Sequence, residues 1–346
     1  MPIGTSGAVK TLLPQELYDV KTTIILGNTY HLFLRPGHDL IHRCGGLHKF
    51  MNWGKSILTD SGGFQVYSLA KLNKISDEGV KFQSHIDGSS HFITPEISME
   101  IQRSLGADII MAFDVCPPGE ATKETVMSAV GQTTKWIKRC KDHLDSSQAL
   151  YDWNQTLFPI IQGGIYPELR KISVEEIVPY STCGIGIGGL AVGEDKMAMF
   201  ENITMLDELL PKDQPRYLMG VGRPTDLVAA VQNGVDMFDC VLPTRNGRNG
   251  QLFTSQGAIN IQNSRYLDDF SCVDEECSCH LCNDYTKAYL RHLFNINEML
   301  GLRLASLHNI TFYMKLMETI RGKINKGEFS KWSVNYLKKY SHDQRM

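Results

Sequence analysis

The chain has 346 residues, of which 42% are hydrophobic and 21% charged, and its formal net charge is −3. This balance is typical of an ordinary soluble protein, and no apolar run approaches the ~18 residues needed to span a bilayer. The sequence opens without a secretory leader, and its nine cysteines, an odd number, argue against a secreted disulfide scaffold. We therefore expect a cytoplasmic protein with reduced thiols and no membrane partner.

Short apolar segments rich in β-forming residues recur along the chain, with helical stretches between them. This alternation predicts βα units around a parallel sheet. Helix starts are signalled by proline or an acid in the first turn, ahead of residues 97–105, 169–177 and 227–231. The predicted strands are residues 22–26, 56–58, 107–113, 157–161, 184–187, 217–219 and 237–242.

These seven strands favour an α/β fold of the (β/α)8 TIM-barrel type over an open doubly wound sheet, which needs fewer strands. The eighth strand is then irregular, formed by residues 1–3, or missing. We place the barrel at residues 1–262. From residue 263 the pattern changes, and we predict a zinc-binding insertion and basic C-terminal helices at 263–346, with helical stretches at 283–300 and 308–323.

Polar side chains and glycines gather where the predicted strands end, which is where barrel enzymes place their chemistry. A single aspartate there is more often a helix cap, but three of them beside small residues favour a ligand site. Together with one carboxamide side chain, the three aspartates suit a site for a flat polar ligand. The four residues are Asp60, Asp114, Asp239 and Gln162.

Residues 184–189 match the pattern G-x-G-x-x-G, which in dinucleotide-binding folds leads directly into a helix. Here another loop follows, from Leu190 to Glu194. The dinucleotide interpretation therefore lacks its structural context and is weak.

Three cysteines with the spacing C-x-C-x-x-C, Cys277, Cys279 and Cys282, can hold one tetrahedral zinc ion in a tight turn. The fourth ligand must come from Cys272, His280 or His308. His308 is attractive because it stands at the opening of a predicted helix. Four protein ligands would make the ion structural. The alternatives are a redox pair or free buried thiols.

The end of the chain is basic, although the whole chain is not. Residues 315–346 contain eight Lys or Arg residues against three acids. Such a stretch suits phosphate contacts, but a solvated helix face explains the same pattern.

Taken together, the motifs resemble those of the tRNA-guanine transglycosylase family, from about Met1 to Tyr340. The resemblance rests on long motifs in the same order and also implies that Cys277, Cys279, Cys282 and His308 bind one structural Zn²⁺. The motifs are ILGNTYHL at 25–32, LTDSGGFQV at 58–66, MAFD at 111–114, GGLAVGE at 188–194, YLMGVG at 217–222 and MFDCVLPTRNGR at 237–248.

The resemblance implies a bacterial-type pentosyltransferase in queuosine biosynthesis. Such an enzyme acts on the tRNAs specific for Asp, Asn, His and Tyr, whose anticodons are GUN. It replaces the guanine at wobble position 34 with 7-aminomethyl-7-deazaguanine (preQ1). Asp239 matches the nucleophile that forms a covalent intermediate with the tRNA. Asp60 matches the general acid/base. Two displacements at one carbon retain its configuration, as in retaining glycosidases.

The same resemblance assigns the base-binding residues. Asp114 would accept from the base N1–H and amine, while Gln162 and the Gly189 amide would donate to its carbonyl oxygen. Phe64 and Met219 match positions that sandwich the ring. The remaining matched positions around the base are Ser61, Cys116, Leu190 and Val192.

The resemblance also implies contact between the tRNA and a second group of residues. The target nucleotide must leave the anticodon stack to reach the site. Arg245 and Arg248 are expected to meet anticodon bases or phosphates, and the basic C-terminal stretch the stem. The loop Gly220, Val221 and Gly222 is assigned to RNA contact as well.

Val192 and Cys116 resemble the bacterial branch, which inserts preQ1. Eukaryotic members tend to have Gly at the first of these positions and insert the bulkier queuine. Archaeal members usually carry a further RNA-binding domain, for which no room follows Lys339. A queuine-inserting variant remains an alternative, since steric exclusion by valine is imperfect.

Family members usually have some tens of residues before the segment Met1–Thr5, including strands that close the barrel floor. This sequence begins at that segment. A chain without those strands is expected to expose apolar surface and to be less stable, while the site residues stay intact. Bacterial members are homodimers, and Tyr285, Tyr289 and His292 match the interface. Their helical spacing suits burial within the subunit equally well.

Two other functions remain open at this stage. A non-catalytic tRNA-binding partner subunit could keep the zinc module, but it would have no need of a nucleophile such as Asp239. A zinc hydrolase would need a metal site with an open position, whereas a site of three cysteines and one histidine is closed.

Overall fold

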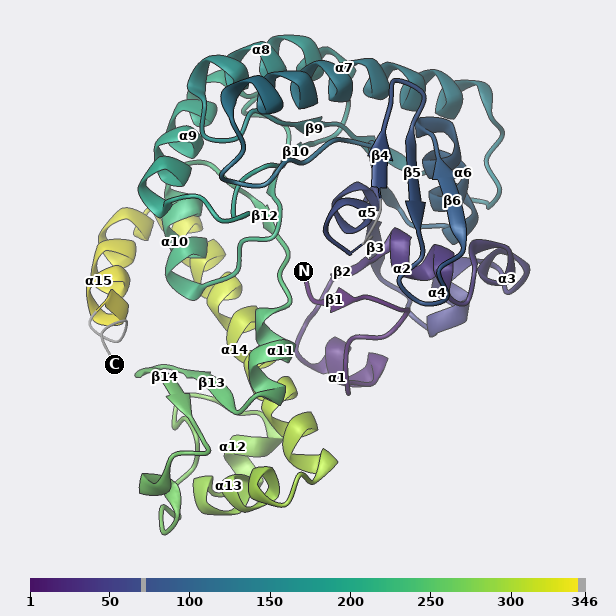
Figure 1. Cartoon of the computed structure of the whole chain (residues 1–346). Coiled ribbons are helices and arrows are strands. Elements are labelled where there is room, and N and C mark those ends of the chain that lie inside the picture. The colour runs from purple at the N-terminus through teal and green to yellow at the C-terminus, as the bar shows by residue number, and fades with distance from the viewer. Residues whose placement is uncertain (70–72, 342–346) are drawn as a thin grey trace.

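Nine short parallel strands among the described residues form a barrel, with helices around its outside (Figure 1); β8 and β9 follow each other as two halves of one barrel strand. The computed structural model describes residues 1–69 and 73–341. One run of hydrogen-bonded strands has the order β1-β2-β3-β7-β8, and the other the order β9-β10-β11-β12. The strands of the barrel are β1 (Ile3–Gly4), β2 (Ile24–Gly27), β3 (Ser56–Thr59), β7 (Ile109–Met111), β8 (Thr156–Phe158), β9 (Ile160–Ile161), β10 (Ile185–Ile187), β11 (Arg216–Leu218) and β12 (Met237–Phe238).

Two junctions join these runs into a barrel. β8 and β9 are halves of the predicted strand 157–161, interrupted at Pro159, which has no N–H for a ladder. At the other junction the nitrogen of Met1 donates to the carbonyl of Phe238, 2.6 Å away. The barrel prediction is confirmed, and of the three options for the eighth strand the N-terminal one is right, with its bounds shifted to β1.

The interior of the barrel is filled by side chains from successive strands. They are Leu26, Leu58, Met111, Phe158, Ile160 and Tyr217. Strand β10 makes room for them, because a Cβ at Gly184 would lie 2.2 Å from the Phe158 ring and one at Gly186 would lie 2.7 Å from Met111 Cε. Gly184 and Gly186, the first two glycines of the G-x-G-x-x-G pattern, therefore serve barrel packing, and no helix follows the pattern until α9 (Lys196–Leu209).

The three helix starts expected from sequence are present. Thr94 caps the first of these helices by accepting from Ile97 N at 3.3 Å, and a proline is the first residue of each helix. The helices around the barrel are α1 (Pro14–Asp19), α2 (Thr29–Leu34), α3 (His38–Arg43), α4 (Gly46–Met51), α5 (Gly63–Leu69), α6 (Pro95–Leu105), α7 (Lys123–Ser146), α8 (Pro167–Ile177), α9, α10 (Pro224–Gln232) and α11 (Leu242–Arg248).

A small antiparallel sheet between α5 and α6 was not predicted. It consists of β4 (Asn73–Ile75), β5 (Val80–Gln83) and β6 (Ser90–Ile93). Its strands are short and partly exposed, although β5 alternates buried and exposed residues. That period-two alternation was the available sequence signal.

The predicted zinc-binding region has its own apolar cluster, to which Leu252, Leu281 and Leu290 belong. Figure 1 shows this region outside the barrel, beyond α11. The hairpin that contributes Leu252 precedes residue 263, and the predicted domain boundary there stays a prediction. The elements are β13 (Gln251–Thr254), β14 (Gly257–Asn260), α12 (His280–Asp284), α13 (Lys287–Asn295), α14 (Met299–Asn325) and α15 (Phe329–Ser341).

Two helix predictions in this region were wrong in their bounds. Residues 283–300 do not form one helix, because α12 ends at Asp284 and Thr286 caps α13 by accepting from Tyr289 N at 3.2 Å. His308 does not open a helix but lies inside α14, which begins at Met299. Of the basic stretch 315–346, residues 342–346 lie outside the described part. No helix among the described residues is long and apolar enough to cross a membrane.

Candidate active site

Asp60 follows β3 directly and is held from the neighbouring strand end. Its Oδ1 accepts from the backbone N–H of Thr29 at 2.9 Å, and its Oδ2 accepts from the Asn28 amide. The residue is only 8% exposed. Burial, with a smaller contribution from the charge of Asp239, raises the pKa of Asp60 to about 7 in spite of the hydrogen bond from Thr29, which lowers it. A carboxyl with this pKa exchanges protons readily near neutral pH.

Asp239 follows β12 and is also buried. Its Oδ1 accepts from the Tyr217 phenol and from the backbone N–H of Gly220 at 2.9 Å. Among the described residues no donor contacts Oδ2. Burial and then the Asp239 charge raise the pKa of Tyr217 well above its ordinary value, so the phenol stays a donor. One oxygen of Asp239 is thus fixed while the other is free to react.

Asp114, after β7, forms a buried polar group with two predicted neighbours. Its Oδ1 accepts from Ser61 Oγ at 2.8 Å, and its Oδ2 accepts from Gln162 Nε2 at 2.7 Å. Burial raises the pKa of Asp114, and both hydrogen bonds oppose that shift. Gln162 Oε1 is buried and has no partner within the described residues. Gln162 Oε1 can therefore accept a hydrogen bond from a ligand, while the two internal hydrogen bonds hold the three side chains in place.

The loop after β10 brings backbone amides to the same end of the barrel. Gly189 has φ +64°, and a Cβ there would lie 2.3 Å from Gln162 Oε1, so only glycine fits. Leu190 is buried, and Val192 is half-buried with its N–H donating to Glu194 at 2.9 Å. Burial, followed by the Asp114 charge, raises the pKa of the neighbouring Cys116 thiol to about 12.

Phe64 and Met219 both follow the C-terminal ends of barrel strands, Phe64 after β3 and Met219 after β11. Phe64 is 44% exposed in the first turn of α5, and Met219 is half-buried after β11. An exposed ring beside the buried aspartates is free to cover a ligand. Their stacking on either face of a base stays a prediction.

The predicted RNA-contacting residues lie in the loop after β11, whose Gly220 N–H contacts Asp239, and on α11, which follows Asp239 in the chain. Arg245 is exposed on α11, whereas Arg248 is half-buried with a buried Nη1 that has no partner among the described residues. Gly220 has φ +76°. A Cβ on Gly222 would overlap the Cys240 sulfur. Val221 is buried between these two glycines.

A cavity of about 550 Å³ lies to one side, between α1 and α14. Asp239 borders it, but Asp60, Asp114 and Gln162 do not. It is therefore separate from the polar residues that suit a base.

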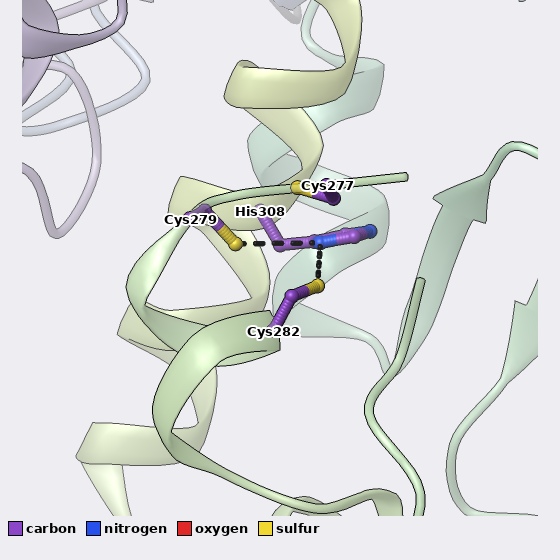
Figure 2. A group of neighbouring side chains, drawn as sticks. All are labelled: Cys277, Cys279, Cys282 and His308. Atoms are coloured by element: carbon purple, nitrogen blue, oxygen red, sulfur yellow. Dashed lines mark hydrogen bonds between the residues drawn. The ribbon is translucent and has the colours of Figure 1, made fainter. Parts of the chain in front are cut away.

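The metal-ligating group predicted from the cysteine spacing is assembled in the structure. The three thiols and the His308 ring offer ligand atoms that all lie within 4.8 Å of one another (Figure 2). His308 Nδ1 lies 3.6 Å from Cys279 Sγ and 3.3 Å from Cys282 Sγ. These separations and donor types fit a tetrahedral zinc ion, whose bonds to sulfur are ~2.3 Å long.

The environment of His308 supports this interpretation. Its Nε2 lies 2.8 Å from the carbonyl of Phe253, which fixes Nε2 as the protonated nitrogen and leaves Nδ1 to bind a metal. The two other candidates for the fourth ligand are excluded. Cys272 is outside the cluster, and the His280 side chain is 74% exposed beside Asp284.

The aromatic residues proposed for an interface lie at the surface of the zinc-binding region. Tyr285 and Tyr289 stack with ring centroids 5.3 Å apart, Tyr289 is 40% exposed, and His292 is exposed. Phe270 and Met299, in the same region, are 75% and 77% exposed. Tyr289 and His292 are therefore not buried within the subunit, which was the alternative explanation for their spacing.

Three residues of the site were not singled out from sequence. Asn28 appeared only within the motif ILGNTYHL at 25–32, without a role of its own. Tyr217 appeared as a strand former, and nothing in the pattern indicated that its hydroxyl reaches Asp239. Arg170 lies in the buried stripe of α8, where a charged residue among apolar positions was the available signal.

Comparisons with known proteins show the family of the chain. The profile of the family described as queuine tRNA-ribosyltransferase matches residues 1–342. A queuine tRNA-ribosyltransferase of Caldanaerobacter subterraneus subsp. tengcongensis is 53% identical over 341 residues, which cover 98% of this chain and 89% of the relative. Those of a Thermoanaerobacter species and Fusobacterium nucleatum are 51% and 50% identical, and each alignment covers at least 98% of this chain and 90% of the relative.

Proposed function

Since the chain belongs to the queuine tRNA-ribosyltransferase family and is thus a pentosyltransferase, we propose that it exchanges guanine at the wobble position of GUN-anticodon tRNAs for preQ1. The observation that carries the proposal is the pair of buried aspartates with different surroundings. Asp60 has a pKa of about 7, while Asp239 keeps one oxygen free of hydrogen bonds among the described residues.

Asp239 is the nucleophile in this mechanism. Its free oxygen attacks C1′ of the ribose while the bond from C1′ to the guanine nitrogen breaks, and the bonding electrons leave with the base. The result is an ester between Asp239 and the tRNA. Tyr217 and the Gly220 N–H hold the other oxygen and thereby set the direction of attack.

Asp60 moves the proton. In its acid form it protonates the departing guanine, and as a carboxylate it then takes the proton from the incoming base, whose nitrogen attacks C1′ and releases Asp239. A pKa near 7 allows one residue to do both. Two inversions at C1′ retain its configuration.

Asp114 and Gln162 recognise the base. The Asp114 carboxylate accepts from the N1–H and the amine, and Gln162 and the Gly189 amide face the carbonyl oxygen. Ser61 and Gln162 already bond to Asp114, which supports a site shaped before the base arrives. Val192 favours the small aminomethyl group of preQ1 over the cyclopentenediol of queuine.

One Zn²⁺ is the metal we assign to Cys277, Cys279, Cys282 and His308. With every position filled by protein it is structural, joining the loop before α12 to the middle of α14. The metal takes no part in the exchange.

The partner is the tRNA anticodon loop, which we expect to meet Arg245 and Arg248 on α11, the helix that follows Asp239. A second copy of the chain is expected to pack on the surface that includes Tyr285, Tyr289 and His292. Because its substrate is tRNA, the enzyme would work in the cytoplasm.

The test is exchange of labelled guanine into tRNA carrying G at the wobble position, with a matched tRNA carrying A there as control. We expect label only in the first. Unlabelled preQ1 and queuine are then compared as competitors, and preQ1 should compete at lower concentration. No exchange into either tRNA would refute the function, and stronger competition by queuine would refute the choice of base.

A further inference from the structure

A fully buried arginine stands behind the loops that carry the proposed base-binding residues. Arg170 is 0% exposed in α8. Its Nε donates to Gly164 O at 2.9 Å, and its Nη1 donates to Ile161 O at 3.3 Å. It also reaches the next loop, with Nη1 donating to Gly188 O at 2.8 Å and Nη2 to Gly189 O at 3.1 Å. One side chain thus binds carbonyls from the ends of two neighbouring strands.

The two carbonyls of the second loop belong to peptide units that matter for recognition. Gly188 O shares its peptide with the Gly189 N–H, and Gly189 O shares its peptide with the Leu190 N–H. In a trans peptide the C=O and N–H point in opposite directions. Because Arg170 holds both oxygens on its own side, both N–H groups point away from α8.

These N–H groups are available to a ligand. The Leu190 N–H donates to no described residue, and the Gly189 N–H faces the thiol of Cys116, a weak acceptor. A positively charged donor on each carbonyl polarises its peptide and strengthens the N–H as a donor.

The form of the contact requires an arginine with its charge. Four carbonyls are reached by one planar group with donors in a fixed fork, which the single ammonium of lysine cannot match. Within the described residues no carboxylate forms an ion pair with Arg170, so its burial is costly. Burial lowers the pKa of Arg170 to about 10, which leaves the guanidinium charged at neutral pH.

We propose that Arg170 is a positioning residue that aims the Gly189 and Leu190 amides at the carbonyl oxygen of the base. It selects bases by the strength of that acceptor. The proposal rests on the proposed function, because it takes the ligand to be a guanine-like base.

A second buried arginine provides the matched control. Arg103 is 8% exposed and donates to the carbonyls of Leu144, Ser147 and Gln148, at the far end of α7. It fixes a loop without facing the site. Arg103→Lys therefore reports the effect of loosening a buried arginine alone.

The experiment measures binding of free bases by displacement of labelled guanine from the whole enzyme. 6-Thioguanine weakens the acceptor at the carbonyl position, and hypoxanthine lacks only the amine that faces Asp114. In Arg170→Lys we expect the preference for guanine over 6-thioguanine to fall by about tenfold, as for loss of one good hydrogen bond. The preference for guanine over hypoxanthine should change less than about twofold, as should both preferences in Arg103→Lys.

An unchanged preference over 6-thioguanine would overturn the proposal, and so would equal loss of both preferences or the same result with Arg103→Lys. Arg170→Gln, which keeps a planar donor without charge, is the second variant if the first does not fold. Loss of the fold in both would show that Arg170 is needed for the barrel itself and would overturn a role in selection.

The outcomes separate this proposal from the function on which it rests. A wild-type protein that binds guanine with the expected preferences but exchanges nothing into tRNA would refute the function and leave the role of Arg170 standing. If the wild type exchanges guanine into tRNA but Arg170→Lys keeps its preference for guanine over 6-thioguanine, the function stands and the role of Arg170 is refuted. A wild-type protein that binds no guanine would overturn both.

Discussion

The Tyr217 phenol donates a hydrogen bond to Asp239 Oδ1 between adjacent strands, with β11 and β12 in parallel register. The bond joins the apolar filling of the barrel to the reactive end of the site. Packing among Met111, Phe158 and the other interior residues thereby fixes the orientation of Asp239.

Tyr217→Phe should slow formation of the covalent intermediate by roughly tenfold to a hundredfold, the range expected for a hydrogen bond to a charged group. The protein should stay folded, because phenylalanine fills the same interior space. Single-turnover adduct formation measures the effect. Tyr340→Phe, which removes another buried phenol bond, to the Thr254 carbonyl, is the control and should leave the rate unchanged. An unaffected rate in Tyr217→Phe would contradict the positioning of Asp239.

The pKa of Asp60 predicts the pH dependence of guanine departure. Burial raises the pKa of Asp60 to about 7, and only the protonated form can donate to the leaving base. The rate of adduct formation should be level below about pH 7 and fall about tenfold per pH unit above it. A rate that rises through that range would show that another group supplies the proton.

The same shift has a consequence for stability. Since the folded-state pKa of Asp60 lies above the ordinary value of 3.8, the folded state binds more protons between 3.8 and about 7. The contribution of Asp60 to the free energy of unfolding should therefore decrease as the pH rises through that window. Denaturant unfolding of wild type and Asp60→Asn across the window tests this, and we expect the difference between the two curves to change with pH. Parallel curves would contradict the assigned shift.

The metal centre predicts that Cys279→Ser loses stoichiometric zinc and melts at a temperature lower by several degrees or more. Cys272→Ser is the matched control, since Cys272 is half-buried near the same loop but outside the ligand group. It should keep both zinc and stability. Metal analysis together with thermal unfolding decides, and retention of zinc by Cys279→Ser would exclude the site.

The exposed aromatic surface predicts that Tyr289→Glu shifts the protein from dimer to monomer, because a charge would be buried against the second copy. Met197→Glu adds the same charge at another surface position, where Met197 is 69% exposed, and should leave the dimer intact. Light scattering over a range of concentrations gives the masses. A wild-type monomer, or an unchanged dimer in Tyr289→Glu, would remove this surface from the interface.

Much of the barrel could be predicted from sequence, because buried parallel strands appear as short apolar runs and polar residues follow them. The aspartates were found for the same reason, and the cysteine spacing located three of the four metal-ligating residues. The spacing left three candidates for the fourth ligand, of which the family resemblance indicated His308. The structure places His308 inside α14, where the packing of α12 against α14 brings it to the thiols.

Contacts between strands were beyond the reach of the sequence. The role of Tyr217 could not be predicted, because the sequence of a strand does not indicate which residue of the neighbouring strand its hydroxyl contacts. Arg170 was hidden because a lone arginine in a helix is usually solvated. The sheet β4–β6 was missed because its strands are three or four residues long and partly exposed, which leaves little periodicity to detect.

The central claim is a covalent intermediate on Asp239, and its most direct test is denaturing electrophoresis and peptide mass analysis after incubation with wobble-G tRNA. We predict a protein–RNA adduct in wild type that maps to the peptide containing Asp239 and is absent from Asp239→Ala, which should also exchange no guanine. An adduct on another residue, or normal exchange in Asp239→Ala, would contradict the account.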